Sequence, residues 1–169
     1  MRKYKFTKEL IGDLVLGRPN LGVKTDVEMY RLMLFSLRDV IEQKFGSKEA
    51  DEIFFEAGKI AGSYFYETYI APVISAEDFF SKIQKVLKEK KIAILRIEEV
   101  LLDSGTVLLT IDEDLECSGL LEIDHEICIY DEGFLSAIFE KYTGEKWLAK
   151  EIDCWGTGSR TCRFIVTKQ

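Results

Sequence analysis

The spacing of apolar residues changes along the chain, from helical in the first half to alternating further on. Thr25 and Glu28 form a capping box, which predicts a helix start, and Gly46 is expected to end that helix. A second helix is predicted from Ser47 to about Ile70. A third is predicted from a cap at Ser75 to about Lys90.

Beyond this third helix the pattern favours strands. We expect two strands at 92–100 and 106–111 joined by a hairpin turn, a third at 115–123, a helix over 133–142 that stops at Gly144, and final strands at 146–153 and 162–167. Short strand-like pieces are also expected within 4–24. Helices that precede most strands predict an α+β fold, with N-terminal helices packed on a mostly antiparallel sheet.

Composition bounds the class of protein. The 169 residues are 47% hydrophobic, which is enough for one sizeable core, so we expect a single domain over 1–169. No run of eighteen apolar residues predicts a membrane helix. Lys8, Glu9 and Asp13 interrupt any apolar signal segment, so a cytoplasmic protein is expected. The net charge of -7 argues against direct nucleic-acid binding.

The candidate chemistry lies in four cysteines of the last third of the chain. In a reducing compartment, clustered cysteines are more often metal ligands or catalytic groups than disulfides. Cys154 and Cys162 flank a seven-residue loop with two glycines, and Glu151 and Cys128 lie close enough in the predicted elements to join them. Zinc accepts three thiolates and one carboxylate, and such a closed shell would be structural. Buried cysteines without a metal would explain the same spacing.

Two further residues near this set stay open. Cys117 is left over by the four-ligand set and is either a small buried hydrophobe or a redox thiol. His125 is the only histidine and is either a surface residue or a substitute ligand. In the second helix, Gly58 and Gly62 lie one turn apart, which suits either close helix packing or a groove that faces a ligand.

Residues 116–166 resemble the 4-vinyl reductase domain family. The resemblance is carried by a cysteine before an acidic-Gly-Phe helix start (Cys128 and 131–134), by Glu151-x-x-Cys154, and by a glycine-bearing loop closed by Cys162 before a last strand. Residues 57–65 match more loosely. The resemblance implies that Cys128, Glu151, Cys154 and Cys162 bind zinc.

The same resemblance implies a fold and a function. The family is similar in fold to the ligand-binding domains of haem nitric-oxide-associated proteins and to TRAPP vesicle-tethering subunits, which are often dimeric. We therefore expect a homodimeric sensor domain that binds a small hydrophobic or aromatic molecule such as a hydrocarbon, signals through a protein partner, and has no assigned catalytic residue. Its expected ligand-pocket residues are Phe65, Tyr69, Tyr130 and Phe134.

Two alternatives remain for the function. One is an enzyme or enzyme subunit that reduces a vinyl group of a tetrapyrrole, although the sequence contains no fingerprint of a hydride-donating cofactor. The other is an assembly or tethering subunit, which rests on likeness of fold alone.

Overall fold

The computed structural model describes residues 3–101 and 104–169. Its chain divides into two compact units, Met1–Leu37 and Arg38–Gln169. Each unit is considered by itself, and the single domain over 1–169 stays a prediction. Asp103, part of the predicted hairpin turn, lies outside the described residues. Within the described ranges, no helix is long and apolar enough to cross a membrane.

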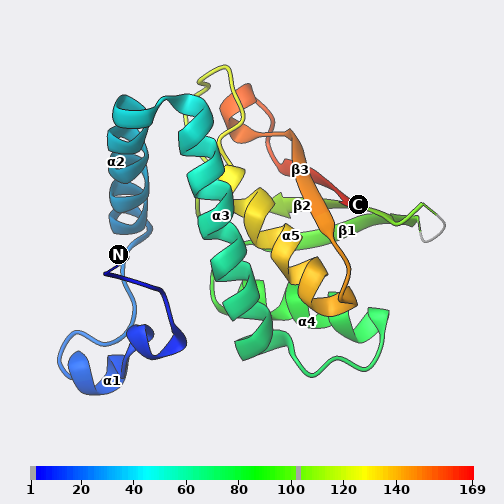
Figure 1. Cartoon of the computed structure of the whole chain (residues 1–169), viewed down its shortest axis with the longest axis horizontal. Coiled ribbons are helices and arrows are strands. Elements are labelled where there is room, and N and C mark those ends of the chain that lie inside the picture. Colours follow the sequence, from blue (N-terminus) through cyan, green and yellow to red (C-terminus); the bar gives the residue numbers. More distant parts are fainter. Residues whose placement is uncertain (1–2, 102–103) are drawn as a thin grey trace. The chain divides into compact units, whose positions relative to one another are not determined.

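The first unit contains a 3-10 turn η1 (Lys8–Ile11), a short helix α1 (Leu14–Gly17) and most of helix α2 (Val27–Phe45) (Figure 1). The strand-like pieces predicted within 4–24 were wrong, because the described residues of that stretch contain no strand. Local hydrogen bonds account for the difference. The Asp13 carboxylate accepts from the Leu16 amide at 2.9 Å, which caps a helical turn.

The helices of the second unit follow the sequence prediction. Helix α3 (Ser47–Phe65) continues into a π-helical turn η2 (Tyr66–Ile70), and α4 (Ala76–Glu89) and α5 (Ile129–Thr143) follow. Gly46 ends α2 with a φ of 88°, a region that favours glycine. The Ser75 hydroxyl accepts from the Asp78 amide at 3.1 Å, as expected of a helix cap.

Four strands form one sheet: β1 (Ile94–Leu101), β2 (Thr106–Asp112), β3 (Trp147–Asp153) and β4 (Cys162–Lys168). Their order is β1-β2-β4-β3, and all neighbours are antiparallel, which confirms the α+β prediction. The strand predicted at 115–123 was wrong. Turns replace it, because the Asp114 carboxylate accepts from the Cys117 amide at 3.0 Å and the Ser118 hydroxyl accepts from the Asp114 amide at 2.7 Å.

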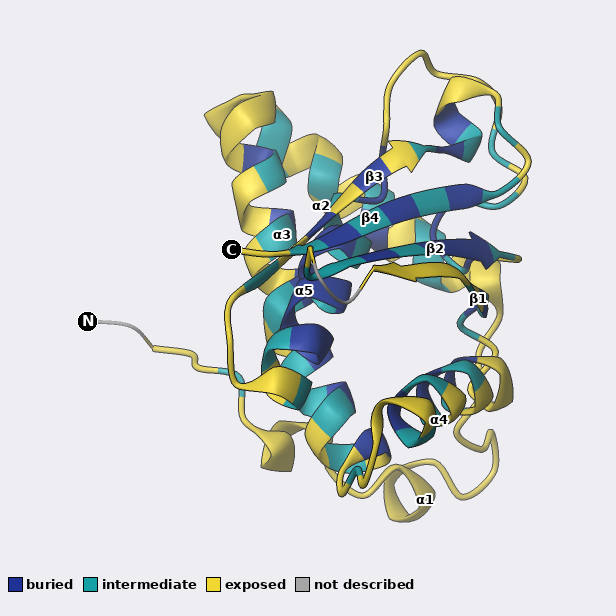
Figure 2. Ribbon diagram, turned by 90° about the vertical axis from the view of Figure 1, so that its right-hand side faces the viewer, coloured by how far each residue is buried: buried dark blue, intermediate teal, exposed yellow. Residues whose placement is uncertain are grey.

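Helix α5 lies between α3 and the sheet, and α4 lies on the same side of the sheet as α5 (Figure 2). The crossing of α3 and α5 is unusually close. A Cβ built on any of the three glycines at the crossing would lie 2.0–2.2 Å from a backbone oxygen of the facing helix; these glycines are Gly58, Gly62 and Gly133. The small residues of α3 therefore serve close helix packing.

Side chains of α5 also cover the free edge of the sheet. Strand β3 is an edge strand, so the amides on its outer side have no neighbouring strand. The Ala149 amide donates to the Ser136 hydroxyl at 2.8 Å, and the Glu151 amide donates to the Glu132 carboxylate at 2.9 Å. These bonds fix the start of α5 beside β3, which places Cys128 next to Glu151.

Candidate metal centre

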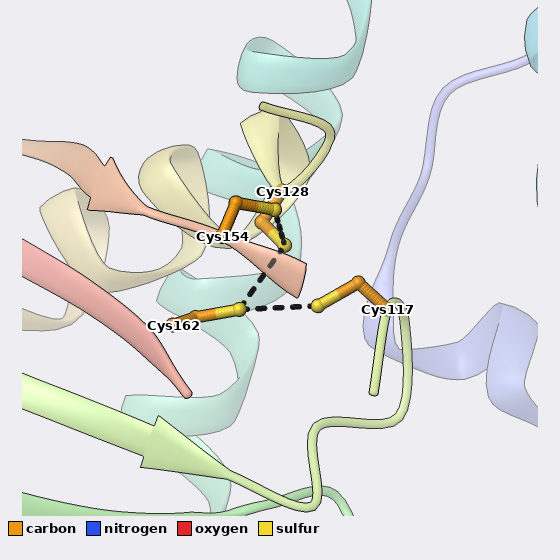
Figure 3. Close-up of side chains that lie close together, drawn as sticks. All are labelled: Cys117, Cys128, Cys154 and Cys162. Atoms are coloured by element: carbon orange, nitrogen blue, oxygen red, sulfur yellow. Dashed lines mark hydrogen bonds between the residues drawn. The ribbon is translucent and has the colours of Figure 1, made fainter. Parts of the chain in front are cut away.

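Four cysteines from four different elements meet in the interior of the second unit (Figure 3). Cys117 lies in the turns after β2, and Cys128 is the residue that precedes the first turn of α5. Cys154 precedes a 3-10 turn η3 (Trp155–Thr157) after β3, and Cys162 begins β4. All four are buried, and their Sγ atoms lie within 4.8 Å of one another.

The sulfur separations can be compared with those of a metal site. A tetrahedral zinc site with Zn–S bonds of about 2.3 Å has S–S edges of about 3.8 Å. The Sγ of Cys128 lies 3.8 Å from that of Cys162 and 3.9 Å from that of Cys154. The Sγ atoms of Cys117 and Cys162 are 3.1 Å apart, closer than this edge and well beyond the S–S bond of about 2.05 Å in a disulfide. The donor set therefore fits a thiophilic divalent ion such as zinc.

The glycine-bearing loop between Cys154 and Cys162 is shaped by its two glycines. Gly158 has a φ of 91°, and a Cβ on Gly156 would lie 2.5 Å from the His125 carbonyl oxygen. The Gly156 amide in turn donates to the Cys154 Sγ at 3.4 Å. Glycine at both positions lets the loop turn back on itself and brings the two sulfurs together, as the sequence predicted.

Cys117 was not part of the ligand set predicted from the sequence, yet its sulfur belongs to the group of four. The turns after β2 bring it there, and the bond from its amide to the Asp114 carboxylate holds this backbone in place. One signal pointed to it, since all four cysteines of the chain lie in the last third. The strand wrongly predicted at 115–123 hid the turn that directs Cys117 inward.

Glu151 lies beside the sulfurs without belonging to the group of four. Its side chain is buried, its Oε2 accepts from the Cys128 amide at 3.3 Å, and its Oε1 has no hydrogen-bond partner within the described part of the chain. Burial, followed by the nearby charges of Cys154 and Cys162, raises the pKa of Glu151 to about 11. A buried carboxyl with an unpartnered oxygen can either keep a proton or face a cation.

Other carboxyls crowd the same region. Burial, and secondly the charge of Asp114, raises the pKa of both Glu116 and Asp131 well above the ordinary range, while the Arg38 charge partly opposes this for Glu116. Carboxylate oxygens of Asp114 and Asp131 also lie within 4.8 Å of the Cys128 sulfur and of each other. The centre thus carries more acidic groups than nearby bases.

The four thiols share protons unequally. Hydrogen bonds from the neighbouring thiols, that of Cys117 first, lower the pKa of Cys154 and Cys162. The pKa of Cys128 is raised, first by its hydrogen bond with Cys117. For Cys117, the hydrogen bond with Cys128 lowers the pKa, but those with Cys154 and Cys162, together with burial, outweigh it and raise the pKa. The thiolate, which is the form that binds metal, therefore forms most readily at Cys154 and Cys162.

The remaining predicted residues fall into two places. His125 is exposed, its Nδ1 lies 2.7 Å from the Ile123 carbonyl oxygen, and it is not part of the sulfur group. The Phe65 ring lies with its centroid 5.3 Å from that of Tyr69 and 5.1 Å from that of Phe134, so three of the four expected pocket residues form one aromatic group around Phe65.

Tyr130 is the fourth expected pocket residue, and its environment differs from that of the other three. Burial, and secondly the charge of Asp131, raises its pKa to about 12. Its carbonyl oxygen faces Gly58 across the contact between α3 and α5. Tyr130 thus lies between the aromatic group and the cysteines along α5.

Comparison with known families supports this region as the most distinctive part of the chain. The model of the 4-vinyl reductase domain matches residues 107–168, which contain the motif region 116–166 and all four cysteines. The resemblance inferred from the sequence is confirmed over this segment.

Two curated relatives come from Methanocaldococcus jannaschii. One, the uncharacterized protein MJ1642, is 31% identical over 87 residues, which is 52% of this chain and 52% of the relative. The other, the uncharacterized protein MJ0150, is 23% identical over 116 residues, 69% of this chain and 64% of the relative. The chain thus spans between half and two thirds of the length of these relatives.

Solved structures share the fold at low identity. A vinyl-4-reductase family protein from Methanocaldococcus jannaschii has a TM-score of 0.65 at 16% identity and covers 98% of this chain and 99% of its own. The phenol-responsive sensory domain of the transcription activator PoxR, solved with phenol, has a TM-score of 0.64 at 15% identity and covers 80% of this chain and 72% of its own.

The fold resembles two further groups, as the sequence analysis expected. A trafficking protein particle complex subunit 3 from Naegleria fowleri has a TM-score of 0.66 at 12% identity and covers 85% of this chain and 95% of its own. An H-NOX protein from S. oneidensis has a TM-score of 0.57 at 16% identity and covers 88% of this chain and 79% of its own. The predicted fold class is confirmed.

Proposed function

Because residues 107–168 match the 4-vinyl reductase domain family, we propose that the protein is a zinc-stabilised sensor domain that binds a small hydrophobic or aromatic molecule. The phenol-responsive sensory domain of PoxR shares its fold, which supports a ligand of this class. The proposed role is regulatory, with occupancy of the ligand site communicated to a protein partner.

One observation carries the proposal: a single helix joins the two candidate sites. Helix α5 begins directly after Cys128, in the sulfur group, and Phe134 on the same helix contacts Phe65 of α3. A ligand that separates or displaces these rings would act on a helix whose first turn is fixed at the metal. Movement of α5 relative to the sheet would then be the signal.

Zinc in this proposal is structural. Cys128, Cys154 and Cys162 are common to the set predicted from the sequence and to the observed sulfur group, and a fourth ligand would close the coordination shell. When bound, the ion would neutralise thiolate charge and hold together the end of β3, the start of β4 and the start of α5. A closed shell leaves no position for an activated water, which supports binding over catalysis.

The ligand part is tested by thermal unfolding of the purified protein with phenol, with alkylbenzenes and with a matched panel of aliphatic alcohols. We expect the melting temperature to rise with aromatic or apolar members, since a ligand that binds only the folded state stabilises it by mass action. Phe134→Ala should reduce that shift, because it removes a ring that contacts Phe65. Phe45→Ala is the matched control, since Phe45 is 60% exposed on α2.

A panel with no shift for any member would contradict ligand binding. If only Phe134→Ala and Phe45→Ala fail to differ, the pocket lies elsewhere than the aromatic group of Phe65, Tyr69 and Phe134. Isothermal titration of the strongest member at 25 °C gives the stoichiometry, which separates one specific site from partitioning into the core.

The proposal also includes a homodimer in the cytoplasm. Helix α3 exposes apolar side chains at Ile53, Ala57 and Ile60, which are one turn apart, and Ile53 and Ile60 are 43% and 46% exposed. An apolar stripe of this kind suits association with a second copy. The four buried free thiols suit a reducing compartment.

A further inference from the structure

We propose that the metal is held by four thiolates, with Cys117 in the position that the family resemblance gives to Glu151. This inference rests on the zinc part of the proposed function and changes its ligand set. It predicts that the Glu151 carboxylate lies outside the coordination shell and holds the backbone of one ligand.

The positions of the sulfur atoms carry the inference. The group of four potential ligand atoms that lie within 4.8 Å of one another consists of four sulfurs, and the Cys117 Sγ is 3.1 Å from the Cys162 Sγ. A small outward shift of either side chain would bring that pair to the edge of about 3.8 Å of a tetrahedral zinc–sulfur site. Two other pairs, Cys128 with Cys154 and Cys128 with Cys162, already have this spacing.

Glu151 already has a different partner. Its Oε2 accepts from the Cys128 amide at 3.3 Å, and its own amide donates to the Glu132 carboxylate at 2.9 Å. This arrangement holds Cys128 at the start of α5 against β3. Residues that hold a metal ligand in place by hydrogen bonding typically affect metal affinity 10–100-fold. Glu151 is therefore assigned as a positioning residue.

Charge does not distinguish the two ligand sets, which leaves geometry to decide. Four thiolates around a divalent ion give the same formal charge of about -2 as three thiolates and one carboxylate. The difference is topological. With Cys117 as a ligand, the ion also fastens the turns after β2 to the sheet and to α5, whereas the carboxylate set leaves these turns without a covalent or metal link.

The test begins with the unaltered full chain. Zinc content is measured by elemental analysis, and X-ray absorption at the zinc edge then counts the ligands. The inference expects one zinc and four sulfurs at about 2.3 Å. Three sulfurs and one oxygen would overturn it while leaving the zinc part of the proposed function intact. A chain without stoichiometric zinc would overturn both.

A reciprocal pair of variants tests the same point in solution after replacement of zinc by cobalt. The intensity of sulfur-to-cobalt charge-transfer absorption follows the number of thiolates. Cys117→Ser should lower it by about a quarter, the share of one sulfur in four, and should weaken metal affinity by more than about 100-fold, beyond the range of outer-shell changes. Glu151→Gln should leave the intensity unchanged and weaken affinity by about 10–100-fold at most.

The carboxylate set predicts the reverse pattern. Cys117→Ser would then leave the absorption unchanged, and Glu151→Gln would shift the visible bands that report cobalt geometry. Intact-mass measurement without reductant covers the remaining alternative, since a Cys117–Cys162 disulfide in the isolated protein would lower the mass by two hydrogens and overturn the inference. Ligand-induced thermal shifts are measured separately, so failure of the sensor proposal is distinguishable from failure of the four-thiolate site.

Discussion

The two ends of helix α5 are buried in opposite ways. At its start, Cys128 lies among sulfurs and Asp131 among carboxyls, and the Asp131 Oδ2 has no hydrogen-bond partner among the described residues. Near its end, the Tyr142 ring stacks on Phe79 with centroids 4.0 Å apart, and Phe139 meets Phe79 edge-on at 5.3 Å. The first end is polar and acidic, whereas the second is aromatic.

This contrast shows which part of the fold can stand without help. Aromatic rings are stabilised by leaving water and by stacking, so the far end of α5 needs no further partner. Buried acidic groups lose hydration and repel one another, so the near end needs protons or a cation to balance them. The helix is one piece of backbone, but its two ends depend on different conditions.

Removing the metal should separate the two ends and give the largest effect. Structural zinc binds zinc-finger peptides with about 10–16 kcal/mol of apparent free energy at pH 7, so its loss should open the segments that carry the ligands. We expect chelation to increase hydrogen exchange strongly at 117–131 and 154–162, while the amides around Phe139 keep their protection. Exchange followed by mass spectrometry, with and without chelator, measures both regions in one sample.

Uniform opening of the whole helix after chelation would show that the two ends are not separate. Restoring zinc should restore the original exchange pattern, which distinguishes loss of metal from irreversible oxidation of the thiols. Reductant is kept in all samples for the same reason.

The aromatic end can be weakened in turn. Phe79 is 0% exposed, and truncating a buried phenylalanine typically costs about 3–5 kcal/mol. Phe79→Ala should lower the free energy of unfolding by that amount, measured by urea denaturation of the zinc-loaded protein, without changing the zinc content. Phe45→Ala makes the same change at an exposed site and should cost less than about 1 kcal/mol. Loss of zinc in Phe79→Ala would mean that the metal depends on the aromatic core.

Sequence patterns predicted the regular elements of the second unit well, because local signals determine them. Gly46 and Ser75 mark helix boundaries through their own backbone or side chain, and these boundaries are confirmed. The convergence of Cys154 and Cys162 was also accessible, since a short glycine-bearing loop between two strands leaves few alternatives. The 4-vinyl reductase motif extended that reasoning to Cys128.

The failures have a common physical cause, which is competition from local polar bonds. Asp114 holds the turn that contains Cys117, so a stretch with apolar residues did not become a strand. Asp13 did the same for the helical turn at 14–17. The position of Cys117 depends on that turn, and spacing alone could not place its sulfur beside Cys162. The contact between α3 and α5 likewise shows its closeness only in three dimensions.

The smallest effect, per unit of change, concerns pH and applies to the metal-free protein. Between about pH 5 and 8 the unfolded chain has ionised carboxyls and protonated thiols. In the folded chain, three carboxyls with raised pKa keep their protons and two thiols with lowered pKa lose theirs; these are Glu116, Asp131 and Glu151, and Cys154 and Cys162. The folded state therefore binds one proton more than the unfolded state, three against two.

Since stability falls with rising pH wherever the folded state binds more protons, the free energy of unfolding should fall by about 1.4 kcal/mol per pH unit over this range. The zinc-loaded protein should show the opposite slope, because thiolates bind metal better as protons leave. Urea denaturation at pH 5.5, 6.5 and 7.5, with chelator and with zinc, measures both slopes. Parallel slopes in the two series would show that the acidic end of α5 is not where the metal acts, whereas slopes of opposite sign would locate both the charge imbalance and its remedy at Cys128 and its neighbours.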